Sequence, residues 1–297
     1  MSSKILITGA EGQLGRVLQL RLGECFEIIP TAKSPTRMAL KNRNVRQMDI
    51  IDFNSVADCI SVEAPDIIIN CAAMTNVDAC EKDHTSARKV NVEGVQNIIK
   101  AVNKKTKIIQ LSTDYVFEGK DGPYIESNPT HPISYYGRSK LEGENVLRGS
   151  LNPYCILRAS VLYGDPVNDK PNFFAWVYDS LSNHKKIHVV TDQLSNPAWL
   201  PALSDAIMKV ILLNAEGIYH FGSDDHLSRY DFAVLIAKVF GLDSTLINPV
   251  TSDSMSFAPP RPAHSGLTTK KITNELDVLT LSTNDCLKMI KKQILVV

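Results

Sequence analysis

Tyr136 and Lys140 lie four residues apart in the segment YYGRSK. In a helix this spacing places both side chains on one face. A free phenol titrates near pH 10, and a neighbouring ammonium favours the phenolate and lowers that pKa. The pair therefore predicts a phenol that exchanges a proton with a bound molecule. A bare YxxxK spacing is also common on helix surfaces, so the rest of the chain must decide between these interpretations.

Ser112 and Thr113 end the apolar segment KIIQLST, which has the composition of a buried strand. In an open α/β sheet the ligand crevice lies at the carboxyl ends of the strands. Reduction of a ketone needs a hydride donor, a proton donor and a group that holds the carbonyl oxygen. We therefore expect three catalytic residues: Thr113 to bind the oxygen, Tyr136 to exchange the proton, and Lys140 to tune the phenol.

A hydride donor is indicated by the segment TGAEGQLG, which follows the first apolar run and has glycines at 9, 12 and 15. A dinucleotide pyrophosphate needs a tight turn, a backbone that it can approach closely, and the free N–H groups of a helix N-terminus. A glycine triplet between a strand and a helix supplies all three. The expected cofactor contacts are Gly9, Gly12, Gln13, Leu14, Gly15, Asp49, Ile50, Ala72, Ala73, Tyr136 and Lys140.

The end of the second strand bears on the choice of dinucleotide. Sites selective for NAD usually carry Asp or Glu there, which binds the ribose hydroxyls. This chain has TAKSPTR instead, and Lys33 and Arg37 have the charge to bind a 2′-phosphate. The segment predicts NADPH as cofactor, with NADH as an alternative, although a solvated basic loop would have the same composition.

The elements that position these residues alternate over the first 160 residues. KILIT, FEIIP, DIIINCAA, KIIQLST and YCILRASVLYG are short apolar runs with helical segments between them, and NVRQMDI is a weaker strand. This order predicts an α/β fold with a Rossmann-type, doubly wound parallel sheet. We expect a dinucleotide-binding domain over 1–160, to which part of 186–216 returns, and a smaller C-terminal substrate-binding α/β domain over 161–297.

Composition excludes several classes of protein. The 297 residues carry 32 basic and 32 acidic side chains, so there is no basic surplus to bind nucleic acid. No apolar run approaches the length of a membrane span, and no signal segment is present at the start. The six cysteines and seven histidines form no metal-binding pattern, and scattered cysteines indicate reduced thiols in a cytoplasmic protein.

The segments TGAEGQLG, NCAAMTNVDACE, LSTDYVFEG, YYGRSKLEGE and LRASVLYG together resemble the extended short-chain dehydrogenase/reductases. Within that superfamily the chain most resembles the dTDP-4-dehydrorhamnose reductase family, and VTDQLSNPAW and RPAHSGLTTKK extend the likeness towards the C-terminus. The resemblance implies NADPH-dependent reduction of the 4-keto group of a nucleotide-activated deoxysugar. It also implies Thr113, Tyr136 and Lys140 as the catalytic residues, and a homodimer is possible because helix pairing across a two-fold axis is common in the superfamily.

The substrate side departs from the family. Val161 occupies a position where the family usually has Trp, and Asn196 and Ala198 also differ from the usual residues. Because valine offers no aromatic face, the sugar pocket must have another shape. Arg261 is our candidate for binding the diphosphate, since a guanidinium can bind two oxygens. The other expected substrate contacts are Tyr115, Val161, Asn172, Asp192 and Gln193.

Two alternatives to a 4-ketoreductase stay open. One is a nucleotide-sugar epimerase on the same scaffold, which would retain its dinucleotide through purification. The other is a non-catalytic regulatory subunit, because the β subunit of methionine adenosyltransferase is similar to this reductase family. A dehydratase is disfavoured, since Tyr115 stands where a second carboxylate would be expected.

Overall fold

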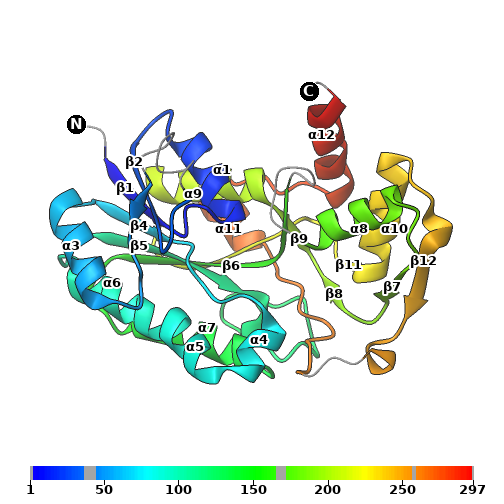
Figure 1. Ribbon diagram of the computed structural model, residues 1–297, viewed down its shortest axis with the longest axis horizontal. Helices are drawn as coiled ribbons and strands as arrows, with labels where there is room; N and C mark the ends of the chain where they lie inside the picture. Colours follow the sequence, from blue (N-terminus) through cyan, green and yellow to red (C-terminus); the bar gives the residue numbers. More distant parts are fainter. Residues whose placement is uncertain (1–2, 37–44, 165–171, 256–258, 296–297) are drawn as a thin grey trace.

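The computed structural model describes residues 3–36, 45–164, 172–255 and 259–295 (Figure 1). Its centre is an eight-stranded sheet of order β10-β6-β5-β4-β1-β2-β3, with β9 paired to β6. The strand pairs of this sheet are parallel throughout the described residues. The strands are β1 Lys4–Thr8, β2 Glu27–Ala32, β3 Arg46–Gln47, β4 Ile67–Asn70, β5 Lys107–Thr113, β6 Tyr154–Tyr163, β9 Pro197–Trp199 and β10 Gly217–Phe221.

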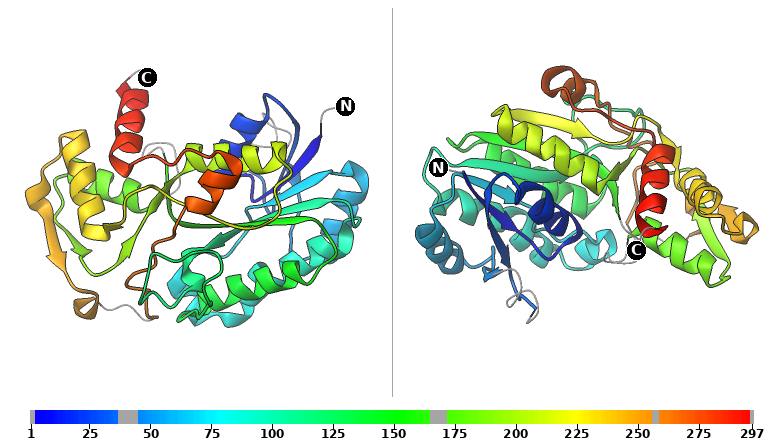
Figure 2. Two further views of the ribbon diagram at one scale, coloured as in Figure 1. Left: turned by 180° about the vertical axis from the view of Figure 1, so that it is seen from behind. Right: turned by 90° about the horizontal axis from the view of Figure 1, so that it is seen from above.

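Helices cover both faces of the sheet, as Figures 1 and 2 show. One face carries α1 (Gln13–Leu22), α9 (Leu200–Leu212) and α11 (Lys270–Leu276), and the other carries α3 (Phe53–Glu63), α6 (Gly94–Ala101) and α7 (Tyr135–Arg148). Successive strand residues point to opposite faces. In β1, Ile5 and Ile7 therefore pack with the first set of helices, and Leu6 packs with the second. Burial on both faces explains why these strands are apolar without alternation.

The smaller part of the molecule has a separate apolar core. It contains α8 (Phe173–Ser182), α10 (Arg229–Phe240) and α12 (Thr283–Leu295). Two short strand pairs accompany them: β7 (Ile187–Val190) with β12 (Ile247–Val250), and β8 (Leu194–Ser195) with β11 (Leu227–Ser228). Tyr163, at the end of β6, packs against Phe174 and Phe232 and so connects this core to the large sheet.

The predicted parallel α/β sheet is confirmed. The segment GIYHFG contains β10, which pairs with β6 at the edge of the large sheet. Together with β9, α9 and α11, this strand brings the second half of the chain back to the large sheet. The sequence predicted that only part of 186–216 would do so, whereas β10 and α11 lie after residue 216.

Three short helices connect β4 to α6. They are α4 (Val77–Lys82), α5 (His84–Arg88) and a π-helical turn over Lys89–Glu93. The π-helical turn runs directly into α6 and contains the buried Asn91. A π-helical turn of this kind is rare and often lies at a functional site.

Candidate active site

The helix α7 carries both residues of the YxxxK pair into the interior. Its N-terminus is fixed by Ser134, whose hydroxyl accepts from the Gly137 amide (3.3 Å), and by Glu81, whose carboxylate accepts from the Tyr135 amide (3.0 Å). A Cβ on Gly137 would lie 2.1 Å from the carbonyl oxygen of Tyr115, so the helix lies against the turn that follows β5. Tyr136 and Lys140 are 9% and 5% exposed, which excludes a surface pair.

Thr113 lies at the carboxyl end of β5 and starts a 3₁₀ turn over Asp114–Val116. Its hydroxyl accepts from the Tyr115 amide (3.2 Å) and donates to the Asp114 carboxylate (3.1 Å). Thr113, Tyr136 and Lys140 line one cavity of ≈ 550 Å³. The structure thus brings together the three residues that the sequence singled out for catalysis.

Burial controls the ionisation of this cluster. It raises the pKa of the Tyr136 phenol, and a hydrogen bond with Thr113 lowers that pKa only in part. The sequence predicted a lowered pKa for this phenol; the pKa is raised instead, because desolvation of the phenolate is the largest effect on it. The phenol is protonated at neutral pH and can serve as a proton donor.

Lys140 is also governed by burial, which lowers the pKa of its ammonium to about 8. The ammonium donates a hydrogen bond to the Leu111 carbonyl (2.6 Å) on β5. At pH 7 the side chain stays positively charged and is held at the carboxyl edge of the sheet.

The predicted dinucleotide cradle has the backbone that such a cofactor requires. Gly9 adopts a φ of +61°, and a Cβ there would meet the Ala72 backbone at 3.0 Å. Gly9, Gly12, Gln13, Leu14, Gly15 and Ala73 line the ≈ 550 Å³ cavity. Gly9 and Gly12 also line an adjoining cavity of ≈ 340 Å³, together with Lys33, Asp49, Ile50, Ala72 and Ala73. The two cavities meet at the glycine loop, as a dinucleotide with its pyrophosphate at the helix N-terminus requires.

The adenosine end of the cradle contains paired charges. The Lys33 ammonium lies 3.1 Å from the Asp49 carboxylate. Glu11, which the sequence analysis did not single out, lines the smaller cavity and accepts hydrogen bonds from the amide (3.1 Å) and hydroxyl (2.8 Å) of Thr36. Arg37, expected at a 2′-phosphate, lies outside the described residues.

The predicted substrate residues divide into two groups. Tyr115, Val161 and Asn172 line the larger cavity. Val161 has a φ of +42°, where β6 has a register irregularity, and a β-branched residue is strained in that region. The strain lies at the wall of the cavity where the sequence departs from the family.

Asp192, Gln193 and Arg261 are not among the residues that line the two cavities, and each has a partner within the protein. The Asp192 carboxylate accepts from the amide and hydroxyl of Ser252 (3.0 and 2.8 Å), and the Gln193 amide donates to the same hydroxyl (2.9 Å). The Arg261 guanidinium donates to the Asp78 carboxylate of α4 (2.8 Å). Asp192 and Gln193 therefore hold a turn, and the ion pair of Arg261 with Asp78 joins the two parts of the molecule.

Comparison with known proteins places this site in a family. A family model described as RmlD substrate binding domain matches residues 3–294. The chain belongs to this family. Its resemblance to the dTDP-4-dehydrorhamnose reductases, expected from the motifs, is confirmed.

Relatives of this RmlD-family chain match along nearly its full length. The spore coat polysaccharide biosynthesis protein SpsK of Bacillus subtilis is 33% identical, covering 91% of this chain and 90% of the relative. The dTDP-4-dehydrorhamnose reductase of Aggregatibacter actinomycetemcomitans is also 33% identical, with coverages of 97% and 98%. The structure of dTDP-4-dehydrorhamnose reductase from Bacillus anthracis in complex with NADP has a TM-score of 0.88 and 30% identity, covering 99% of this chain and all of that one.

A relative of another kind is the β subunit of methionine adenosyltransferase 2 from Xenopus laevis. It is 28% identical and covers 91% of this chain and 82% of the relative. The proteins similar to this chain therefore include one named as a subunit of a different enzyme.

Two buried polar residues were not predicted from the sequence: Asp114, which lines the larger cavity, and Asn91, which contacts the catalytic helix α7. Asn91, in the π-helical turn, binds the amide (2.9 Å) and carbonyl (3.1 Å) of Met74 and donates to the Ser139 hydroxyl of α7 (2.9 Å). Asp114 accepts from Ser160 on β6 (3.0 Å) and from Ser265, which precedes α11. Asp114 could have been found, because it directly follows Thr113 in the motif STDYVF. Asn91 could not, because a lone asparagine in a helical segment has no distinguishing pattern.

Across the described residues, no group of three or more His, Cys, Asp or Glu side chains is placed to hold a metal ion. Among the helices in that part of the chain, none is both long and apolar enough to cross a membrane.

Proposed function

We propose that the protein reduces the 4-keto group of a nucleotide-activated deoxysugar with NADPH. The observation that carries the proposal is one cavity lined by both the glycine loop, Gly9 to Gly15, and the cluster of Thr113, Tyr136 and Lys140. A dinucleotide in the cradle and a carbonyl at the cluster would share that cavity. The close structural match to a reductase in complex with NADP supports the choice of cofactor.

The chemistry follows from the ionisation of the site. NADPH, when bound, supplies the hydride that the carbonyl carbon receives. The Thr113 hydroxyl holds the carbonyl oxygen, and Tyr136, protonated because burial raises its pKa, donates the proton that the oxygen needs. Lys140 stays cationic below a pKa of about 8 and binds the nicotinamide ribose. Removing the sugar from water in the cavity strengthens each of these interactions.

The substrate class rests on relatives and on the cavity. The 33% identical relative from Aggregatibacter actinomycetemcomitans is a dTDP-4-dehydrorhamnose reductase. Tyr115 and Asn172 line the larger cavity beside the catalytic cluster, and the Asn172 amide lies 3.4 Å from the side-chain oxygen of Gln13 in the glycine loop. We assign the sugar to this region and the nucleotide end to the side towards Arg261. A homodimer stays a prediction.

The direct test is oxidation of NADPH, followed by absorbance, with dTDP-4-keto-6-deoxy-L-mannose. Turnover of roughly 1–1,000 per second would support the reductase. Absence of turnover with this sugar and with other 4-keto sugars, although NADPH binds, would contradict the proposal.

Tyr136→Phe tests the assignment of the proton donor. The substitution removes the phenolic hydroxyl and keeps the ring, so we expect NADPH to bind with unchanged affinity and turnover to fall by about 10²–10⁴-fold. Cofactor titration and steady-state rates measure the two effects separately. A variant that turns over near the wild-type rate would show that another group donates the proton.

The second candidate is a regulatory subunit, favoured by the similarity to the methionine adenosyltransferase β subunit. It predicts a stable complex with a separate catalytic chain and no reduction of keto-sugars. Affinity purification of the protein at its natural abundance, followed by identification of stoichiometric partners, distinguishes it from the reductase. An epimerase is distinguished by dinucleotide that stays bound through purification.

A further inference from the structure

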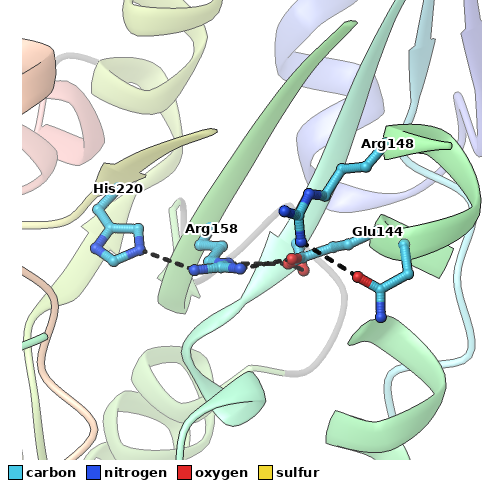
Figure 3. Close-up of polar contacts among 6 residues, drawn as sticks. Glu144, Arg148, Arg158 and His220 are labelled. Carbon is cyan, nitrogen blue, oxygen red and sulfur yellow. Dashed lines mark hydrogen bonds and ion pairs between the residues drawn. The ribbon is translucent and has the colours of Figure 1, made fainter. Parts of the chain in front are cut away.

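A buried row of charged side chains lies behind the catalytic helix. The Arg158 guanidinium on β6 donates two hydrogen bonds to the Glu144 carboxylate on α7 (3.0 and 2.6 Å), and the Glu144 and Arg158 side chains are 0% and 2% exposed. Glu144 also accepts from the Ser112 hydroxyl on β5. Figure 3 shows Glu144, Arg158 and His220 in this row, with the exposed Arg148 outside it. None of the three lines the larger cavity.

His220, on β10, completes the row. Its Nδ1 lies 3.1 Å from the Tyr124 carbonyl oxygen, and its Nε2 lies 3.4 Å from Arg158. A carbonyl only accepts, so Nδ1 carries the proton and Nε2 accepts from the guanidinium. Burial and the Arg158 charge lower the pKa of His220 to about 3, so the ring is neutral. Phe117 lies against both, with its ring 5.1 Å from the guanidinium carbon and at a steep angle to the imidazole.

A buried ion pair of this kind is poorly explained by stability alone. Desolvation of the two charges can exceed their mutual attraction, and an apolar pair of similar volume is often as stable. The row is connected to the site through α7, because Glu144 follows Lys140 by four residues and lies on the same helix face. It therefore places a carboxylate, fixed by Ser112 and Arg158, one turn from the buried ammonium.

The surroundings of Lys140 leave Glu144 as its main counter-charge. The groups that face the ammonium are the Leu111 carbonyl on β5, Cys71 after β4, Cys80 on α4 and Glu144 on α7. The two thiols are protonated at neutral pH, since burial raises the pKa of Cys71 to about 12 and that of Cys80 to about 11. Burial lowers the Lys140 pKa, and Glu144 raises it more than the thiols do.

We propose that Glu144, held by Ser112 and by the Arg158 that His220 contacts, is a positioning residue that keeps Lys140 charged at the cofactor cavity. The inference rests on the proposed role of Lys140 in binding the dinucleotide. It does not depend on which sugar is reduced, because cofactor binding alone can test it. The network would then set the pH range over which the enzyme takes up NADPH.

The experiment measures the NADPH dissociation constant between pH 6 and pH 10 without any sugar. For the wild type we expect affinity to fall above about pH 8, as Lys140 loses its proton. In Glu144→Gln the midpoint should fall by about one pH unit, which gives about tenfold weaker binding at pH 9 and nearly unchanged binding at pH 6. Lys140→Met should bind weakly at every pH and show no midpoint in this range.

Two further variants separate charge from folding. Glu144→Gln leaves the Arg158 charge buried without its partner, so the double variant Glu144→Gln/Arg158→Met removes both charges and should fold while keeping the lowered midpoint. Glu142→Gln is the matched control, because Glu142 is on the same helix but exposed, paired with Arg88. A wild-type midpoint in the double variant, an equal shift in Glu142→Gln, or no midpoint in the wild type would each overturn the proposal. Failure of the proposed sugar chemistry would leave these binding curves unchanged.

Discussion

At the scale of single residues, Lys140 occupies an environment that opposes its charge. Its side chain is 5% exposed, and the pKa of about 8 lies below the ordinary value near 10.4. The unfolded chain therefore binds one more proton than the folded chain between about pH 8 and pH 10. The unfavourable contribution of Lys140 to folding is complete below pH 8 and disappears as the pH rises through this window.

Replacing Lys140 by Met should therefore stabilise the protein without ligand. We expect a gain on the order of 3 kcal/mol in the free energy of unfolding at pH 7, and the difference from the wild type should vanish by about pH 10.5. Urea denaturation at a series of pH values measures it. Lys107 offers a matched control, since it is buried, has a pKa lowered by burial and donates to Asn214 at the other end of β5 (3.0 Å). Lys107→Met should leave NADPH binding intact. If Lys140→Met had the same free energy of unfolding as the wild type at pH 7, the assigned burial cost would be contradicted.

The sequence predicted the placement of the central residues better than that of the peripheral ones. Thr113, Tyr136 and Lys140 could be found because a strand end and a helical spacing place them without knowledge of any loop. Asp192, Gln193 and Arg261 could not be placed, because their partners Ser252 and Asp78 depend on the path of distant segments. The direction of the Tyr136 pKa was also missed, since spacing shows a neighbour but not the loss of water around both groups.

At the scale of elements, the fit between α7 and the turn after β5 sets the distance between the proton donor and Thr113. Gly137 lies between Tyr136 and Lys140 and contacts the Tyr115 carbonyl. Gly137→Ala would place a methyl group 2.1 Å from that oxygen, so the helix must move. We expect turnover to fall by roughly 100-fold or more, because misplacement of about 1 Å has this cost.

The comparison is with Gly149→Ala at the other end of α7. There the nearest atom, the Asn145 carbonyl oxygen, is 3.4 Å from the added Cβ, which is ordinary contact. Steady-state kinetics and thermal unfolding of both variants separate displacement of the helix from loss of fold. If Gly137→Ala kept the wild-type rate, the spacing of the two elements would not control the reaction.

The sequence indicated most strands correctly but not where each of them pairs. Apolar runs bounded by turns predicted β1, β2, β4, β5 and β6, which the sheet buries on both faces. The weak third strand is only Arg46–Gln47, paired with β2. β10 was expected in the smaller domain, because an isolated apolar run does not show which sheet it joins. The π-helical turn at Asn91 was not predicted, since its residues have ordinary helical patterning.

At the scale of the whole molecule, the large sheet is built from both halves of the chain. β9, α9, β10 and α11 come after residue 160, and α9 and α11 cover the face on which Ile5 and Ile7 lie. A fragment of residues 1–160 would expose that face and lack the edge strand. We expect it to show strand and helix signals by circular dichroism but no cooperative thermal unfolding, unlike the full chain. Cooperative unfolding of the fragment would contradict this interdependence.

The late position of β10 also has a consequence for biosynthesis. Roughly 50 residues separate the end of β6 from the start of β10, and a ribosome needs roughly 3–10 s to add them. During that interval the nascent chain has its glycine loop and its tyrosine helix but an open sheet edge and an uncovered apolar face. These are surfaces that chaperones bind and through which partly folded chains aggregate. The sheet that carries the glycine loop would thus be complete only after most of the second half of the chain has been translated.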